Sequence, residues 1–106
     1  MLLEKYKVRL SIQAKEDYKR IIEYMKYELL EPNIAERYAK LIRNELDSLK
    51  HYPQKFAIID NDIIKQYKFR KLIIKNYIVF YRINEDEKTV NVERILYSAT
   101  DWKNKL

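Results

Sequence analysis

The sequence contains no glycine and no cysteine, and only one histidine and two prolines in 106 residues. Loops that depend on glycine, such as the Walker A loop, the dinucleotide fingerprint and the EF-hand loop, are therefore excluded. The lack of cysteine excludes disulfides, thiolate nucleophiles, zinc ribbons and iron–sulfur clusters. With His51 alone, neither a histidine-built metal site nor a Ser–His–Asp triad is expected, so we expect no metal and no cofactor.

The sequence also lacks a long hydrophobic segment. No apolar run approaches the roughly 18 residues that a membrane-spanning helix needs. The first residues, MLLEKYKV, lack the apolar core of a secretory signal. We therefore expect a cytoplasmic protein with no membrane partner. A hydrophobic content of 47% is too high for a disordered chain, and the length suits a single domain over residues 1–106.

Positive charge is what the chain has in excess. It carries 22 Lys and Arg against 16 Asp and Glu, a formal net charge of +6. Residues 65–82 hold six basic residues and no acidic one, so this stretch accounts for the whole excess. The six are Lys65, Lys68, Arg70, Lys71, Lys75 and Arg82. We therefore expect one basic sheet surface that binds nucleic acid or an acidic protein segment.

The first half of the chain predicts one strand and two helices. Residues 5–10 alternate between apolar and basic side chains, which is typical of a half-buried strand. Ser11 can cap a helix whose apolar residues recur at helical spacing, and Pro32 limits this helix to about residue 30. A capping-box pattern at Asn33–Glu36 predicts a second helix that ends before Pro53. The short connection predicts an antiparallel helical hairpin.

The second half predicts a loop over residues 54–65 and then strands. The runs rich in β-branched and aromatic residues are 66–74, 77–83 and 89–96. Asn76 and Asn84 lie in the two connections, and we expect them to take the left-handed backbone geometry that glycine would otherwise supply. The sequence therefore predicts an α+β fold with an N-terminal strand, a two-helix antiparallel hairpin and a three-stranded antiparallel meander.

The stretch from Phe69 to Trp102 carries a set of motifs in a fixed order. An arginine at position 70 precedes an apolar run, a Tyr-x-φ-φ-Tyr strand follows at 77–81, and a short acidic turn covers 85–87. A V-x-V-x-R-φ-φ pattern then leads to an aromatic-to-Asp-Trp ending. Together with the Ala-x-x-Asp-Tyr motif at 14–18, these features resemble the RelE/ParE superfamily of bacterial toxins from type II toxin–antitoxin systems. The resemblance covers almost the whole chain.

The resemblance implies a growth-inhibiting toxin, of the kind found in plasmid-stabilisation modules, that a cognate antitoxin neutralises. ParE-like members bind DNA gyrase and are not known as enzymes, whereas RelE-like members cut messenger RNA on the ribosome. Many relatives carry arginines just before the final aspartate, but this chain has Ser98, Ala99 and Thr100 before Asp101. This departure favours gyrase as the target. The alternatives are a metal-independent mRNA endoribonuclease and, from charge alone, a non-catalytic nucleic-acid-binding module.

If the chain were a RelE-like nuclease, the residues around the scissile phosphate would be Lys68, Arg70, Arg82 and Tyr97. Arg70 falls on the family's strand arginine, and Lys68, two residues earlier on the same predicted strand, should face the same side. Tyr97 falls where many members have histidine, and it could act as a general acid or stack on a base. With Lys71 and Lys75 added, the cations of this group are also the expected contacts of the target or the antitoxin.

Each of these residues also has a purely structural explanation. Arg70 can tie its strand to the C-terminal segment by hydrogen bonds, and Tyr97 can close the rim of the core. Exposed lysines can protect a strand edge from pairing. His51 is expected to complement the C-terminus of the second helix rather than to act in catalysis. Asp101 is expected to pair with Arg70 or Arg94.

Overall fold

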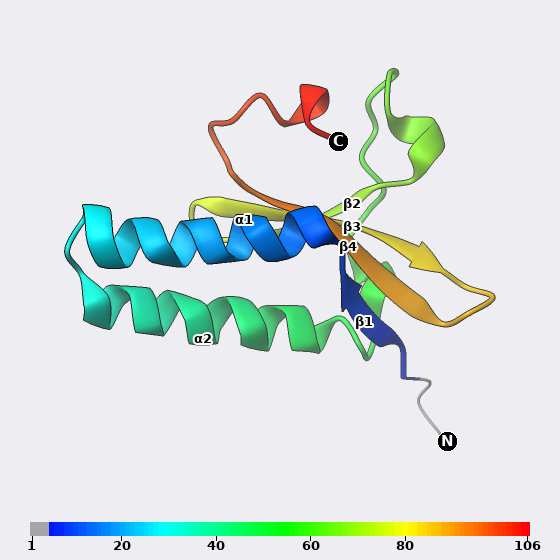
Figure 1. Cartoon of the computed structure of the whole chain (residues 1–106). Helices are drawn as coiled ribbons and strands as arrows, with labels where there is room; N and C mark the ends of the chain where they lie inside the picture. Colours follow the sequence, from blue (N-terminus) through cyan, green and yellow to red (C-terminus); the bar gives the residue numbers. More distant parts are fainter. Residues whose placement is uncertain (1–4) are drawn as a thin grey trace.

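The computed structural model describes residues 5–106, in which two helices cover one face of a four-stranded sheet (Figure 1). The elements are β1 (Lys7–Leu10), α1 (Ile12–Glu23), α2 (Pro32–Ser48), β2 (Arg70–Ile74), β3 (Tyr77–Asn84) and β4 (Thr89–Tyr97). The strand order is β1-β4-β3-β2, with β1 parallel to β4 and the other pairs antiparallel. The predicted α+β arrangement is confirmed. Within these residues no helix is long and apolar enough to cross a membrane.

The N-terminal strand and the first helix form where the sequence predicts them. The alternate apolar residues of β1 pack against the core, and the cations between them are exposed. Ser11 caps α1, because its Oγ accepts a hydrogen bond from the Ala14 N–H at 2.9 Å. The same hydroxyl donates to the Glu93 carbonyl at 2.7 Å. One side chain therefore both starts the helix and fixes its first turn to β4.

The connection between the two helices contains a π-helical turn and a residue with a left-handed backbone. Residues Tyr24–Glu28 form a π-turn directly after α1, and Leu30 then has a φ of 54°. The predicted end of the first helix near residue 30 is confirmed. Tyr27 is 62% and Leu30 is 75% exposed, so this end of the hairpin presents large apolar side chains to solvent. A left-handed backbone at a residue with a Cβ costs roughly 1–2 kcal/mol.

The start of α2 differs from the predicted capping box. Pro32 occupies the first turn, and Glu31 before it makes no side-chain cap. Proline suits this place because its missing N–H would have no intrahelical partner there. Asn33 lies inside the helix, so its predicted capping role is wrong. The helix ends at Ser48, and Pro53 begins a short 3₁₀ turn beyond it.

Lysine, rather than asparagine, takes the left-handed positions in the second half of the chain. The residues with positive φ there are Lys68, Lys75 and Lys88, at 58°, 55° and 53°. The prediction that Asn76 and Asn84 supply this geometry is therefore wrong. Asn84 supports the β3–β4 turn in another way, because its Oδ1 accepts a hydrogen bond from the Glu87 N–H at 3.0 Å.

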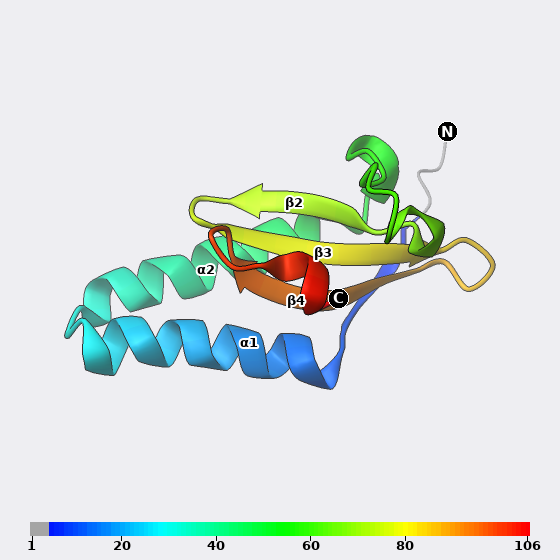
Figure 2. The same cartoon turned by 90° about the horizontal axis from the view of Figure 1, so that it is seen from above.

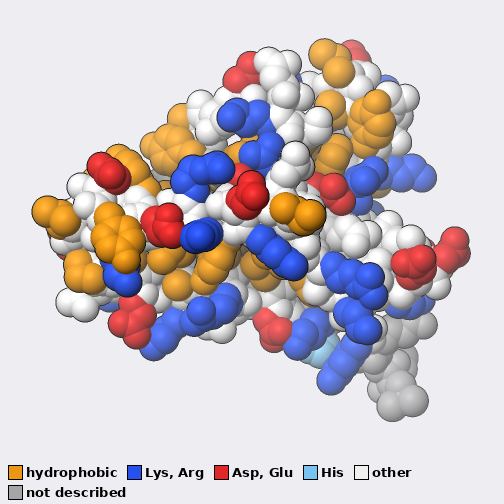
Figure 3. All heavy atoms as spheres, in the orientation of Figure 1, with side chains coloured by type: hydrophobic (Ala, Val, Ile, Leu, Met, Phe, Trp, Pro, Cys, Tyr) orange, Lys and Arg blue, Asp and Glu red, His pale blue; other side chains and the backbone are white. Residues whose placement is uncertain are grey.

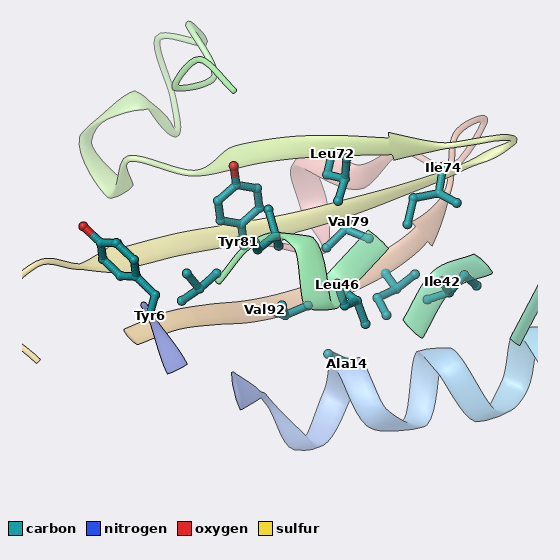
Figure 4. Close-up of a cluster of buried hydrophobic side chains, with 12 residues drawn as sticks. Tyr6, Ala14, Ile42, Leu46, Leu72, Ile74, Val79, Tyr81 and Val92 are labelled. Carbon is teal, nitrogen blue, oxygen red and sulfur yellow. The ribbon is translucent and has the colours of Figure 1, made fainter. Parts of the chain in front are cut away.

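The main core lies between the helices and the face of the sheet that they cover, which we name the inner face (Figure 4). Its fully buried side chains include Ile42 of α2, Val79 and Tyr81 of β3, and Val92 and Ile95 of β4. The two central strands thus supply most of the sheet's share of this core, and α2 supplies the opposing wall.

A second hydrophobic core lies on the opposite face, which we name the outer face. Its members are Ile59, Ile64, Phe69, Ile78, Phe80 and Leu96. The C-terminal segment crosses this face together with the loop that precedes β2 (Figures 1 and 2). The ring of Trp102 lies 5.1 Å from that of Phe80. The middle of the sheet is therefore buried on both sides.

Candidate functional site

The protein itself engages the guanidinium of Arg70. The strand register places Arg70 opposite Tyr81, whose side chain belongs to the inner-face core. The Arg70 Nη1 donates to the carbonyl oxygens of Gln54 at 3.2 Å and Phe56 at 2.5 Å. Arg70 thus fastens the loop after α2 to the sheet. Arg70 therefore forms structural hydrogen bonds, as the sequence led us to expect. The expected partner was wrong, because these bonds go to the loop after α2 and not to the C-terminal segment.

Tyr81 completes this attachment from the neighbouring strand. Its side chain is fully buried, and its hydroxyl donates to the Pro53 carbonyl at 2.6 Å. Burial raises the pKa of the Tyr81 phenol to about 12, and the nearby Arg70 guanidinium offsets part of that rise. The phenol is therefore a neutral hydrogen-bond donor at physiological pH.

Lys68 does not share a strand with Arg70. Residues Lys65–Tyr67 form a 3₁₀ turn, Lys68 follows with a left-handed backbone, and β2 begins only at Arg70. The expectation that the two cations face the same side is wrong, because strict alternation holds only within a continuous strand.

Lys68 and Arg82 instead line one hollow of about 390 Å³. Arg82 lies opposite Asn91 in the β3–β4 register, and its guanidinium carbon is 5.2 Å from the ring centre of Phe69. Phe69 belongs to the second core, so Arg82 is on the outer face. A carboxylate oxygen of Glu93 lies 3.6 Å from the Arg82 Nη2. Of the four residues proposed for RNA cleavage, these two are brought together.

Tyr97 lies at the other end of the sheet and on the inner face. It stands opposite Tyr77 with ring centres 5.8 Å apart, and the Tyr77 ring contacts that of Tyr38 on α2 at 6.1 Å. Along β3, Tyr77 and Arg82 are roughly 17 Å apart, at about 3.4 Å per residue. Tyr97 and Arg82 therefore face different surfaces.

The remaining cations of the basic stretch are dispersed. Lys71 is exposed on the outer face, and Lys75 is exposed at the β2–β3 turn. Lys65 forms an exposed ion pair with Asp62 at 3.7 Å. Because Arg70 points to the inner face, the six basic residues do not form the single sheet surface that the sequence led us to expect.

Sequence reasoning missed a buried ion pair between α1 and β4. Asp17 is only 3% exposed. Its carboxylate accepts hydrogen bonds from the Arg94 Nε at 2.8 Å, the Arg94 Nη2 at 3.0 Å and the Ile95 N–H at 3.0 Å. The hydrogen bond to Asp17 raises the pKa of the Arg94 guanidinium. The Arg94 Nη1 also donates to the Lys105 carbonyl at 3.1 Å. This pair therefore joins α1, β4 and the C-terminal segment.

One signal in the sequence could have revealed this pair. Asp17 falls between Ala14 and Tyr18, within the apolar stripe of the first helix, and a carboxylate on a buried stripe needs a charged partner. Asp101 was the wrong choice of partner for Arg94. Its carboxylate instead accepts a hydrogen bond from the Asn104 side chain at 2.6 Å.

The only histidine lies beyond the second helix. The His51 side chain is exposed. The backbone N–H of His51 donates a hydrogen bond to the carbonyl of Ser48, the last residue of α2. In the described part of the chain, no group of three or more His, Asp or Glu side chains is placed to hold a metal ion.

A hollow of about 760 Å³ lies between β1 and α2, and we name it the β1 groove. Its apolar lining consists of Tyr6, Val8, Leu10, Tyr18 and Leu46. Its charged lining consists of Lys5, Lys7, Arg43, Lys50 and Asp47, and Asp47 is itself paired with Lys50. Figure 3 shows Lys and Arg side chains gathered over this region. Among residues 5–106, β1 is an edge strand, and one side of its backbone has no neighbouring strand there.

A second apolar hollow, of about 660 Å³, lies at the turn of the helical hairpin. Tyr24, Leu29, Ile34 and Tyr97 are among its lining residues, and each is partly exposed. Burial raises the pKa of the Tyr77 phenol beneath them, and the neighbouring phenols raise it further. Figure 3 shows hydrophobic side chains at this end of the molecule. Contiguous exposed apolar surface is typical of sites that contact a protein, a membrane or a ligand.

Comparison with protein families gives one match that spans most of the chain. A family model described as the ParE toxin of the type II toxin–antitoxin system parDE matches residues 8–102. No curated protein matches the sequence.

Solved structures give matches over nearly the whole fold. The chain is similar to a chain of the chromosomal ParDE toxin–antitoxin system from P. aeruginosa, with a TM-score of 0.71 and 16% identity. That match covers 88% of this chain and 96% of the other. The chain is also similar to one in the RelBE2 toxin–antitoxin complex from Mycobacterium tuberculosis, with a TM-score of 0.64 and 19% identity. Here 93% of this chain and 98% of the other are covered.

Proposed function

Because the chain belongs to the ParE family of toxins of type II toxin–antitoxin systems, we propose that it inhibits growth by binding DNA gyrase. A cognate antitoxin neutralises it in this proposal. The action uses a protein surface rather than a catalytic centre. The toxin acts as a single domain. It acts in the cytoplasm, because its target and its antitoxin are there.

The observation that carries this proposal is the second core on the outer face. Apolar side chains beneath Trp102 fill the middle of that face. RNA cleavage needs acid–base groups and cations that converge on one phosphate. Arg70 instead binds loop carbonyls, and Tyr97 lies at the far end of the inner face. This arrangement supports target binding over the alternative of mRNA cleavage, which would have to rely on Lys68 and Arg82.

The exposed end of the helical hairpin is the surface that we assign to gyrase. The π-turn and the left-handed Leu30 hold Tyr24 and Tyr27 outward, where they are 51% and 62% exposed. Tyrosine is enriched among the residues that dominate binding energy in protein interfaces. Two exposed tyrosines at the end of a packed helical pair are therefore a suitable contact for a large protein target.

The β1 groove is the surface that we assign to the antitoxin. The related structures are toxin–antitoxin complexes. The open edge of β1 can accept an extended segment through backbone hydrogen bonds, and the apolar lining can receive every second side chain. The surrounding cations, Lys5, Lys7, Arg43 and Lys50, select acidic residues on that segment.

Expression in bacterial cells tests the target. Plasmid supercoiling should change within minutes of induction, while the 5′ ends of messenger RNAs stay as they were. Tyr27→Ser should abolish the effect on supercoiling. Ile63→Ser is the matched control, because Ile63 is also an exposed apolar residue, at 72%, but lies on the loop before β2. Codon-phased cuts in messenger RNA with normal supercoiling would overturn the proposal.

Binding of the antitoxin encoded beside the gene tests the β1 groove. Arg43→Glu should weaken the complex at least tenfold, because it places a carboxylate where the groove offers a cation. Lys40→Glu, on the same helix but outside the groove, should change the affinity less than twofold. Equal effects of the two substitutions would show that the β1 groove does not bind the antitoxin.

A further inference from the structure

The turn of the helical hairpin both projects from the molecule and forms one wall of a hollow. We infer that two copies of this chain associate at this end, each inserting its turn into the hollow of the other. Figures 1 and 2 show α1 and α2 extending beyond the β2–β3 turn. The hollow of about 660 Å³ lies between these helices and the same end of the sheet. We name residues 28–31 the hairpin tip.

The hairpin tip consists of two leucines between two glutamates. Leu29 is 52% and Leu30 is 75% exposed. Glu28 and Glu31 on either side of them are exposed, and within residues 5–106 neither carboxylate forms an ion pair. The tip therefore combines an apolar surface with two negative charges that the described part of the chain does not neutralise.

Backbone hydrogen bonds hold the hairpin tip in one conformation. The Leu29 N–H donates to the Tyr24 carbonyl at 3.0 Å, and the Glu31 N–H donates to the Met25 carbonyl at 2.9 Å. The positive φ of Leu30 lies between these two bonds. A surface that is already ordered loses less conformational entropy when it binds.

The hollow is apolar, and the charged groups at its edge are basic. Arg20 is its charged lining residue, and Lys75 is exposed next to the lining residue Asn76. Arg20 lies 3.6 Å from Asp17, whose carboxylate already accepts three hydrogen bonds from other groups. Lys75 has no ion pair in the described residues. The apolar and aromatic lining includes Tyr24, Leu29, Ile34, Tyr38, Tyr77 and Tyr97.

Tip and hollow are complementary, and one molecule carries both. Leucine side chains flanked by carboxylates match an apolar hollow flanked by cations. A two-fold dimer needs such a self-complementary surface, because every contact occurs twice with the two copies exchanged. Leu29 belongs to both the tip and the lining of the hollow, so the two features are adjacent. A single approach of two copies can therefore form both contacts at once.

The distribution of charge also favours this end for contact between two copies. With a formal net charge of +6, two chains repel each other over most of their surface. Residues 20–38 contain three basic and four acidic residues, a net charge of −1, so the remainder of the chain carries +7. The hairpin end therefore lets two copies approach with little like-charge repulsion.

Association at this end would regulate the toxin. Tyr24 lines the hollow, so the dimer covers part of the surface that we assign to gyrase. The dimer is then an inactive form that releases active monomers on dilution. This consequence rests on the proposed function, whereas the association itself is a property of the isolated chain.

Sedimentation equilibrium of the purified full chain, without gyrase or antitoxin, tests the association. We expect a reversible monomer–dimer equilibrium with a dissociation constant on the order of 10 μM, because the interface is small. Leu30→Asn removes the apolar side chain and keeps a residue that tolerates the left-handed backbone, so it should weaken association at least tenfold. Ile63→Asn is the matched control, because Ile63 is 72% exposed on the loop before β2, and it should change association less than twofold.

An exchange of charges tests how the two copies are arranged. Glu28→Lys and Lys75→Glu should each weaken association at least threefold, because each places like charges together across the interface. The double variant should associate within twofold of the wild-type chain. Lys71→Glu, an exposed cation of β2 that does not line the hollow, should change association less than twofold.

Three results would overturn the inference. One is a chain that stays monomeric up to submillimolar concentration, and this result would leave inhibition of gyrase untouched. Another is a dimer whose dissociation constant Leu30→Asn does not change. The third is a double charge variant that associates no better than the two single variants.

Discussion

Removal of the Asp17 carboxylate should destabilise the fold more than any exposed charge substitution. Asp17 is 3% exposed and accepts three hydrogen bonds, two from Arg94 and one from the Ile95 N–H. In Asp17→Ala the Arg94 guanidinium, whose side chain is only 16% exposed, loses its partner. Breaking a buried pair by removing one member costs about 3–5 kcal/mol. That is a large fraction of the roughly 5–15 kcal/mol by which small domains are stable.

Urea unfolding followed by circular dichroism measures this loss. With a slope of about 1–3 kcal/mol per molar urea, a loss of about 3–5 kcal/mol should lower the urea midpoint by roughly 1–5 M. Asp17→Asn keeps an acceptor for the Ile95 N–H and should lose less. Asp62→Ala is the control, because the Asp62 side chain is 97% exposed in its pair with Lys65, and its effect should stay within about 0.5 kcal/mol. A loss below about 1 kcal/mol in Asp17→Ala would refute the assignment of this pair as a clasp between α1 and β4.

Three further predictions concern the second core, the buried tyrosine and the left-handed lysines. Trp102→Ala should lower the free energy of unfolding by about 2 kcal/mol, less than for a fully buried ring because Trp102 is partly exposed, and calorimetry measures the change. Tyr81→Phe leaves the Pro53 carbonyl without its donor and should cost about 1–3 kcal/mol. The pKa of Tyr81 is raised from 10.0 to about 12 in the folded protein. Below pH 10 the Tyr81 phenol is neutral in both the folded and the unfolded state, so its full contribution to the free energy of unfolding is present there. It is lost as the pH rises towards 12, so wild-type stability should fall there more steeply than that of Tyr81→Phe. Lys75→Gly should leave the free energy of unfolding unchanged or raise it by up to about 1 kcal/mol, because glycine removes the cost of a positive φ. Urea unfolding measures this change.

The order of elements could be predicted because local patterns and packing agree. The alternation in β1, the Ser11 cap and the β-branched runs of β2, β3 and β4 each specify the element that forms. The backbone geometry of the turns was harder to predict from the sequence. Asparagine is the more favourable residue at a positive φ. Lys75 and Lys88 nevertheless take these positions, so residue preference alone did not identify them.

The candidate site was harder to predict because spacing in sequence fixes a face only within a regular element. Lys68 and Arg70 are two residues apart, yet the 3₁₀ turn and the left-handed residue between the loop and β2 separate their side chains. Arg94 was recognised as part of a strand motif, but its partner lies 77 positions away on α1. The apolar stripe of the first helix indicates that Asp17 needs a charged partner, but no local pattern identifies Arg94 as that partner.

We propose that this toxin binds gyrase through the exposed end of its helical hairpin, where Tyr27 is 62% exposed. The most direct measurement is a plasmid supercoiling assay with purified gyrase and the purified protein. We predict inhibition at micromolar protein, loss of inhibition in Tyr27→Ser, and retention in Ile63→Ser. Gyrase that remains fully active at a tenfold molar excess of folded protein would contradict the claim.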